Sequence, residues 1–276
     1  MPAIPISTLD DPRVQMYRSL KAQNLSRQGP WFIAEGVRVV ERLLDSDFET
    51  DSVLLTERRA DEWLPKIPDR IPVYLVPQSE ADQLVGFNFH VGVVACGRRR
   101  RSPTLDAVLP QDRRRLTVVV CPNCDNPENL GAIVRMCLGF GVDLLLLGPH
   151  CSDAFSRRVI RVSMGAIFRQ PVIESRNLER DLLRLRTEWG FEFAATILDP
   201  TAVPLDPTTP RAERFGLLFG NEAFGLDDCW VEQCDRRLTI PMAPGADSLN
   251  VAVATGIFLH HFQRLTVPSP QPEVTP

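Results

Sequence analysis

The segment LTVVVCPNCDNPENLGAIVRMCLGFGVDLLLLG, residues 116–148, decides the fold class. It holds an apolar run at Leu116–Cys121, a helical stretch at Leu130–Phe140 and a second apolar run at Val142–Leu147. Short strands that are apolar at nearly every position and alternate with helices are typical of a parallel sheet covered on both faces. The segment therefore predicts an α/β fold built on a parallel sheet.

The same alternation continues beyond this segment. It predicts helices at Ser156–Val162, Asn177–Trp189 and Leu249–Leu265, and strands at Phe191–Thr196, Phe215–Phe219 and Leu238–Ile240. We assign residues 116–267 to one C-terminal domain. Residues 268–276 are rich in proline and are predicted to form a flexible tail.

Residues 1–97 are predicted to form a smaller α/β domain. Its helices are expected at Asp11–Gln23, Arg38–Leu44 and Glu80–Leu84, and its strands at Trp31–Glu35, Ser52–Leu55, Val73–Val76 and Val91–Cys96. Residues 98–115 contain two arginine runs and several prolines, which predicts a polar linker. The arginine runs are open to two interpretations, contact with an RNA backbone or a solvated linker.

Composition sets limits on the class of protein. The 276 residues carry 31 Lys and Arg against 35 Asp and Glu, a net charge of -4, so bulk charge does not indicate a nucleic-acid binder. There is no apolar run of about 20 residues and no signal-peptide pattern, so we expect no membrane association and a cytoplasmic protein. The seven cysteines are expected to be reduced, and Cys121 and Cys124 lack a second ligand pair, so no metal site is predicted.

The first of three polar clusters is DNPENLG at Asp125–Gly131, followed by Arg135. We interpret Asn129 as a helix cap and Gly131 as a point of close backbone approach, with Arg135 roughly one helical turn further on. A helix start at the carboxyl end of a parallel strand is a common ligand site in α/β proteins. Taken alone, the cluster fits an ordinary helix start with a solvated arginine equally well.

The other two clusters follow later strands. FGNEAFGL at Phe219–Leu226 places two glycines around Glu222, which indicates a tight ligand-binding loop. LTIPM at Leu238–Met242 leads past Gly245 to SLNVAVA at Ser248–Ala254, where we interpret Ser248 as the cap of the last helix.

In this order and at these separations, the three clusters resemble the three motifs of the SpoU branch of the SPOUT RNA methyltransferases. The resemblance covers Leu116 to about Leu265, and RVSMGAIFR at residues 161–169 is also similar to the family. FIAEG at residues 32–36 is similar to the start of the substrate-binding domain that many of these proteins carry in front. The resemblance implies a trefoil knot in the C-terminal domain, S-adenosylmethionine as cofactor, and a homodimer.

The resemblance also implies a reaction and the residues that serve it. The reaction is methyl transfer to a ribose 2'-hydroxyl of structured RNA, either rRNA or tRNA. The catalytic surface would consist of Asn129, Arg135, Glu222, Ser248 and Asn250. The cofactor would be held by Phe219, Gly220, Ile240, Met242 and Leu249.

The role of Arg135 is best described as a clamp. An arginine guanidinium is a poor proton acceptor, so we assign Arg135 to the adjacent phosphate and the developing oxyanion rather than to general base catalysis. Ala223 and Ala252 stand where glycine and serine are common in the family. Two alternatives remain, a non-catalytic RNA-binding member of the same fold and a SPOUT enzyme that methylates a base.

Overall fold

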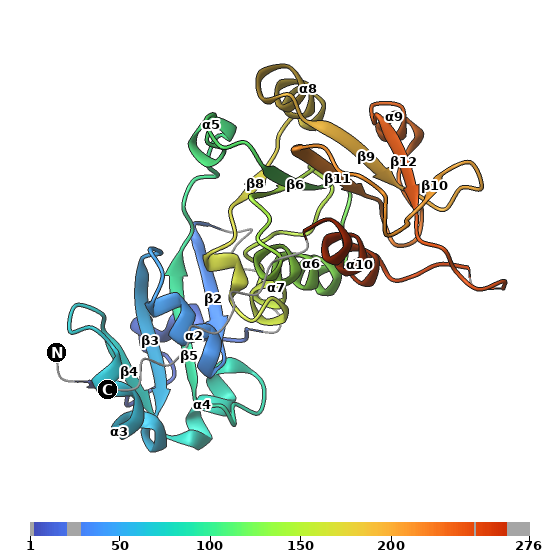
Figure 1. Cartoon of the computed structure of the whole chain (residues 1–276). Coiled ribbons are helices and arrows are strands. Elements are labelled where there is room, and N and C mark those ends of the chain that lie inside the picture. Colours follow the sequence, from blue (N-terminus) through green and yellow to red (C-terminus); the bar gives the residue numbers. More distant parts are fainter. Residues whose placement is uncertain (1–2, 21–28, 246, 264–276) are drawn as a thin grey trace, which may run out of the picture.

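The computed structural model describes residues 3–20, 29–245 and 247–263, which form two β-sheets joined side by side (Figure 1). The predicted tail, residues 268–276, lies outside the described residues, as do residues 264–267 at the end of the predicted C-terminal domain. The division of the chain at residues 97 and 116 stays a prediction.

The N-terminal sheet has five strands in the order β1 (Ile4–Pro5), β4 (Val73–Val76), β3 (Thr50–Thr56), β5 (Val93–Arg98) and β2 (Trp31–Glu35). The first three are parallel, and β5 runs antiparallel to both β3 and β2. Two helices accompany this sheet, α2 (Val37–Leu44) and α4 (Gln78–Val85). Shorter helical turns are η2 (Glu57–Arg59), α3 (Ala60–Trp63) and η3 (Leu64–Lys66).

The helix expected at Asp11–Gln23 is wrong. The chain forms only a 3-10 helix, η1 (Pro12–Tyr17), whose first turn is capped by the side chain of Asp11. The backbone then turns at Ser19, which has a φ of 51°, and the Ser19 N–H donates to the carbonyl of Leu84. The backbone of Ser19 therefore bonds to the end of α4 instead of continuing the helix. Residues 21–23 lie outside the described part of the chain.

The C-terminal sheet is parallel throughout its seven strands, as the sequence predicts. The strand order is β10 (Val203–Pro204), β12 (Arg236–Thr239), β9 (Glu192–Thr196), β11 (Arg214–Phe219), β6 (Leu116–Cys121), β7 (Leu144–Leu147) and β8 (Val172–Glu174). The sequence pattern did not predict β8 and β10, because segments of three and two residues are too short to show a period.

Helices cover both faces of this sheet (Figure 1). One face carries α6 (Pro127–Gly139) and α10 (Val251–Gln263), and the other carries α5 (Leu105–Val108), α8 (Leu178–Trp189) and α9 (Asp228–Val231). In β6, Val119 belongs to the hydrophobic cluster of the first face and Val118 to that of the second. This double cover explains why the strands are apolar at successive positions.

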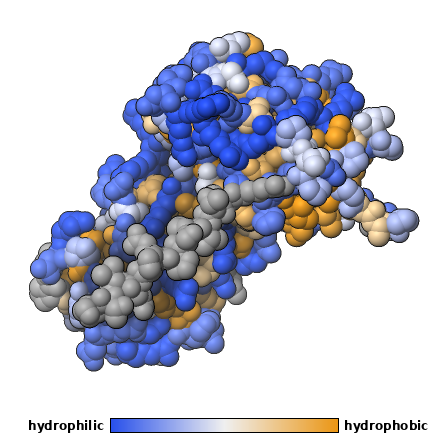
Figure 2. All heavy atoms as spheres, viewed as in Figure 1, coloured by the Kyte–Doolittle hydropathy of each residue, from blue (hydrophilic) through white to orange (hydrophobic). Residues whose placement is uncertain are grey.

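Helix α10 leaves apolar side chains exposed on the side away from the sheet. Val253 and Ile257 are 52% and 37% exposed, and we call these two residues the α10 stripe. Figure 2 shows hydrophobic surface around the position that α10 has in Figure 1. The spacing of four residues places both side chains on one face of the helix.

The two sheets are joined by α7 (Arg157–Val162) and the turn η4 (Ala166–Phe168). Phe32 of β2 and Phe48 pack against Phe155 and Phe168, with ring centroids 5.5–5.7 Å apart. Glu35 of β2 is buried and forms an ion pair with Arg157. One continuous hydrophobic cluster therefore includes residues from both sheets.

The predicted linker, residues 98–115, is more ordered than a solvated connection. Arg98 ends β5, and Leu105 of α5 is buried beneath the C-terminal sheet. Arg99 pairs with Asp153 and Glu174 at 3.0 and 2.7 Å, and Arg115 donates to the carbonyl of Phe262 at 2.9 Å. Arg99 and Arg115 thus bond to distant parts of the chain, while Arg98, Arg100, Arg101, Arg113 and Arg114 are exposed.

Candidate active site

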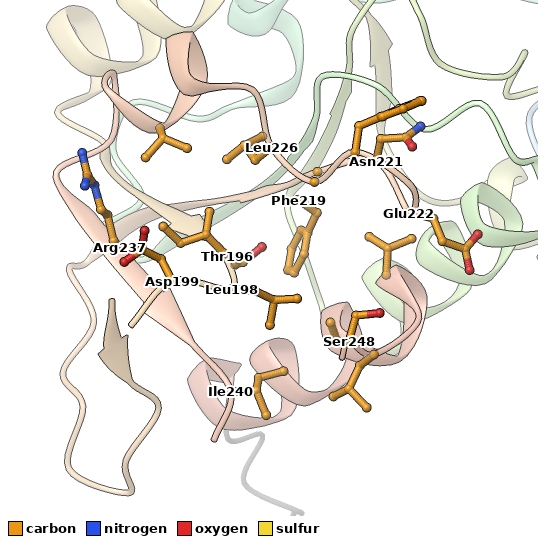
Figure 3. A pocket seen from close by; sticks show the side chains of 18 of the residues that line it. Thr196, Leu198, Asp199, Phe219, Asn221, Glu222, Leu226, Arg237, Ile240 and Ser248 are labelled. Atoms are coloured by element: carbon orange, nitrogen blue, oxygen red, sulfur yellow. The ribbon is translucent and has the colours of Figure 1, made fainter. Parts of the chain in front are cut away.

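A cavity lies at the carboxyl edge of the C-terminal sheet. Because β9, β11 and β12 are parallel, the loops that follow them all emerge at this edge, where α10 also begins. Together they enclose about 550 Å³ (Figure 3). This is the size range of ligand sites, at the position where α/β proteins bind ligands.

The five residues predicted to bind the cofactor all line this cavity, namely Phe219, Gly220, Ile240, Met242 and Leu249. Gly220 shows why the loop needs glycine, because a Cβ atom there would stand 2.2 Å from the carbonyl carbon of Gly225. The loop after β11 therefore brings Gly225 too close to position 220 for any side chain there, and this close approach shapes the wall of the cavity.

Three polar side chains from the three motifs meet at one end of the cavity. The Asn129 Nδ2 donates to Glu222 Oε2 at 2.6 Å, and the Asn250 Nδ2 donates to Glu222 Oε1 at 2.9 Å. The Asn250 Nδ2 also donates to Asn129 Oδ1 at 2.9 Å. Glu222 itself lines the cavity, as does Ser248, so four of the five predicted catalytic residues gather here.

Two helix caps differ from those expected. Asn126 caps α6, with its Oδ1 accepting from the Glu128 N–H at 2.9 Å, so the expectation that Asn129 is the cap is wrong. Pro127 takes the first helical position, which proline favours, so the helix starts three residues before Leu130, the expected start. The side chain of Asn129 is thereby free to bond Glu222.

The cap of α10 is also shifted by two residues. The Asn250 Oδ1 accepts from the N–H groups of Ala252 and Val253 at 3.0 and 3.3 Å, so Asn250 and not Ser248 caps the helix. Asn250 thus uses its oxygen for the helix and its nitrogen for Glu222, which fixes the orientation of its amide group.

A second set of contacts ties the loop after β11 to the loop after β6. The Asn221 Nδ2 donates to Asp125 Oδ1 at 3.0 Å, and the Asn221 Oδ1 accepts from the Ala223 N–H at 2.8 Å. The backbones of Asn221 and Gly225 bond each other in both directions, at 2.7 and 2.9 Å. No sequence motif pointed to these roles of Asn221 and Asp125.

Arg135 lies apart from the other predicted catalytic residues. Its side chain is exposed on α6 and does not line the cavity. Within residues 3–20, 29–245 and 247–263 it has neither a hydrogen bond nor an ion pair, so its guanidinium is available to a ligand from outside the chain.

The far end of the cavity was not predicted from the sequence. Leu198 and Asp199 follow β9, Arg237 belongs to β12, and Figure 3 shows Asp199 and Arg237 away from Glu222 and Ser248. Hydrogen bonds from the side chain and backbone of Thr201 lower the pKa of Asp199. Position at the carboxyl end of a parallel strand was the signal that could have found Leu198 and Asp199.

The cysteines are free thiols, as expected. Burial raises the pKa of Cys124 to about 12 and that of Cys151 to about 11, which keeps both protonated and unreactive. In the described part of the chain, no three His, Cys, Asp or Glu side chains are grouped to hold a metal ion. The described helices include none long and apolar enough to span a membrane.

An all-parallel sheet with a polar cavity at its carboxyl edge is the arrangement of an α/β enzyme. The family model of the SpoU rRNA methylases matches residues 116–260, more than half of the chain. The chain therefore belongs to the SpoU rRNA methylase family, whose members are RNA methyltransferases.

Individual relatives extend the likeness to nearly the whole chain. An uncharacterized tRNA/rRNA methyltransferase of Mycobacterium bovis is 33% identical over 92% of this chain and 90% of its own length. The 23S rRNA (guanosine(2553)-2'-O)-methyltransferase of Bacillus subtilis is 27% identical over 94% of this chain and 98% of its own. The AdoMet-bound rRNA methyltransferase of Sinorhizobium meliloti superposes with a TM-score of 0.79 at 26% identity, covering 95% of this chain and 98% of the other.

Proposed function

We propose that this protein transfers the methyl group of S-adenosylmethionine to a ribose 2'-hydroxyl in rRNA or tRNA. The observation that carries the proposal is the contact of Asn129 and Asn250 with Glu222 on the wall of the cavity. The Bacillus subtilis relative, which is named a 2'-O-methyltransferase, supports the ribose as acceptor. The N-terminal sheet and its helices would contact the RNA.

The cavity fits the chemistry of S-adenosylmethionine. Ile240, Met242 and Leu249 offer apolar surface to an adenine ring, with Phe219 packed behind them, and the backbone at Gly220 is open to close approach. Carboxylates at both ends of the cavity, including Asp199 and Glu222, suit the positive sulfonium and ammonium groups. The cofactor supplies the electrophilic methyl group, and the Sinorhizobium meliloti relative was solved with it bound.

The protein side chains then have to place the acceptor. Glu222 fixes the amides of Asn129 and Asn250, which with the Ser248 hydroxyl would hold the target ribose in line with the methyl group. Arg135 would clamp the adjacent phosphate and stabilise the developing alkoxide, because its exposed guanidinium suits both anions. The hydroxyl proton would leave to water or to that phosphate.

The proposal includes a homodimer and a trefoil knot. The α10 stripe supports the dimer, because it exposes apolar surface that a second copy of the chain would cover. The knot is proposed because the three sequence motifs resemble those of the SpoU branch, and the chain belongs to the SpoU rRNA methylase family.

The test compares RNA from cells with and without this gene by mapping 2'-O-methyl groups in total tRNA and rRNA. We expect one ribose methylation to disappear and to return with the wild-type gene. Arg135→Ala should not restore it, and purified Arg135→Ala should lose roughly 10²–10³-fold in methyl transfer, as when a transition-state donor is removed. Arg135→Lys should recover part of this loss, because it restores the charge without the planar fork.

The control is Arg180→Ala, an exposed arginine on α8 on the opposite face of the sheet. It should leave the rate unchanged. Retention of most activity in Arg135→Ala would refute the clamp. A methylated base in place of a methylated ribose would favour a base-methylating enzyme, and cofactor-free RNA binding would favour a non-catalytic protein.

A further inference from the structure

A large aromatic side chain stands exposed in the loop after β11. Phe224 is 85% exposed, although it lines the same cavity as Glu222. Within the described residues no aromatic ring or cation packs against it. Phe219, on the same segment, is 1% exposed and fills the interior, so the two rings serve different surfaces.

Hydrogen bonds fix the loop that exposes Phe224. Asn221 and Gly225 close the loop through their paired backbone hydrogen bonds, and the side chain of Asn221 anchors it to Asp125. Gly225 has a φ of +73°, which completes the tight turn next to Phe224. The loop therefore holds an aromatic ring in solvent, where an apolar side chain of this size gains nothing by itself.

Phe224 is two residues from Glu222, so their Cα atoms are at most about 7 Å apart. A nucleotide whose ribose lies against Asn129, Glu222 and Asn250 carries its base one glycosidic bond away. We propose that Phe224 stacks on a nucleobase of the RNA substrate and thereby positions the ribose for methyl transfer. This inference rests on the proposed function and assigns to that site a residue that recognises the RNA.

The geometry favours the RNA over the cofactor as the partner of this ring. The cofactor would occupy the interior of the cavity, whereas Phe224 lines the cavity with 85% of its surface exposed to solvent. Single-stranded or splayed nucleotides are the RNA elements that aromatic side chains stack on, and every base offers a π-face. Phe224 therefore positions a nucleotide without selecting its sequence.

The experiment compares wild type with Phe224→Leu, which keeps the apolar bulk, and Phe224→Trp, which keeps the aromatic face. Leu183→Ala on α8 is the control, because Leu183 is also an exposed apolar residue but does not line the cavity. Binding is measured by fluorescence anisotropy with a labelled single-stranded RNA of about twelve nucleotides. The second probe is a sugar-phosphate chain of equal length without bases, and S-adenosylhomocysteine is present throughout.

We expect Phe224→Leu to weaken binding of the RNA by roughly 5- to 150-fold, the usual range for losing one base stack, and to leave the base-free chain unaffected. Phe224→Trp and Leu183→Ala should bind both probes like the wild type. Affinity for S-adenosylmethionine and the molecular mass in light scattering should not change in any variant. In methyl transfer, Phe224→Leu should raise KM for RNA more than it lowers kcat.

Three results would overturn the proposal. Equal weakening of both probes would show that the ring contacts no base, loss of cofactor affinity would place it against the cofactor, and a changed mass would place it in a dimer interface. The proposed function is tested separately, with labelled S-adenosylmethionine and RNA from cells lacking the gene. If wild type transfers no methyl group, the proposed function fails, while the binding comparison still decides the role of Phe224.

Discussion

Glu222 accepts from two amide groups, one at each carboxylate oxygen. Its Oε2 bonds the Nδ2 of Asn129 at 2.6 Å and its Oε1 bonds the Nδ2 of Asn250 at 2.9 Å. Only a carboxylate can serve both donors, because an amide in its place would turn one acceptor into a donor. The negative charge also strengthens both bonds.

We therefore expect Glu222→Gln to reduce kcat for methyl transfer by roughly 10- to 150-fold, the loss associated with a hydrogen bond to a charged group. The amide nitrogen of the new side chain would face one of the two amide donors and displace it. Glu188→Gln on α8, where Glu188 is an exposed partner of Arg184, should keep the wild-type rate. Single-turnover kinetics with saturating cofactor measure the effect, and a Glu222→Gln rate above half of wild type would contradict this account.

At the scale of elements, the sequence predicted the strands and helices that have long apolar patterns well. It predicted poorly the helix starts that depend on a single capping residue. The strands β6 and β11 and the helix α8 follow their expected ranges closely, because each strand is a continuous apolar run and α8 repeats its apolar residues with the helical period. Asn126 and Asn129 are both good cap residues, and only the position of Pro127 in the first turn distinguishes them. The cavity residues Leu198 and Asp199 have no local motif and depend on where β9 ends.

Helix α10 gives the prediction that belongs to this scale. Its buried residues, including Phe258 and Leu259, face the sheet, whereas Val253 of the α10 stripe is 52% exposed. If a second copy covers the stripe, Val253→Glu places a charge in an apolar interface and should shift the mass in multi-angle light scattering toward the 31.0 kDa of one chain. Leu183→Glu on α8 is the matched control and should keep the wild-type mass.

A wild-type mass of one chain, or an unchanged dimer mass in Val253→Glu, would exclude the α10 stripe as the contact between copies. Circular dichroism should show the same helix content in both variants, because each replaces an exposed residue on a helix. The comparison therefore separates loss of association from loss of folding.

At the scale of the whole molecule, the sequence predicted two α/β units but not how they join. Phe32 and Phe48 lie more than 100 residues from Phe155 and Phe168, and no local period links the two pairs. The arginines at residues 98–115 led to the prediction of a polar linker because their acidic partners are distant in sequence and no local pattern reveals the pairs. Contacts of this kind follow from the packing of complete sheets.

Because one hydrophobic cluster includes residues of both sheets, the described chain should unfold as a single unit. We expect one calorimetric transition with equal calorimetric and van't Hoff enthalpies. Glu35→Ala, which breaks the buried ion pair to Arg157, should lower the free energy of unfolding by roughly 1–3 kcal/mol, since Arg157 keeps a quarter of its side chain in water.

For a protein of this size, that loss lowers Tm by roughly 2–12 °C. The matched control is Glu41→Ala, whose exposed partner is Lys66 at 3.4 Å and whose effect should stay within about 0.5 kcal/mol. Two separate transitions in the wild type would mean that the aromatic contact does not couple the sheets. If Glu35→Ala still unfolds in one transition, but at a lower Tm, the contact between the sheets stabilises both of them. The proposed RNA-contacting unit and the cavity would then keep a fixed spacing.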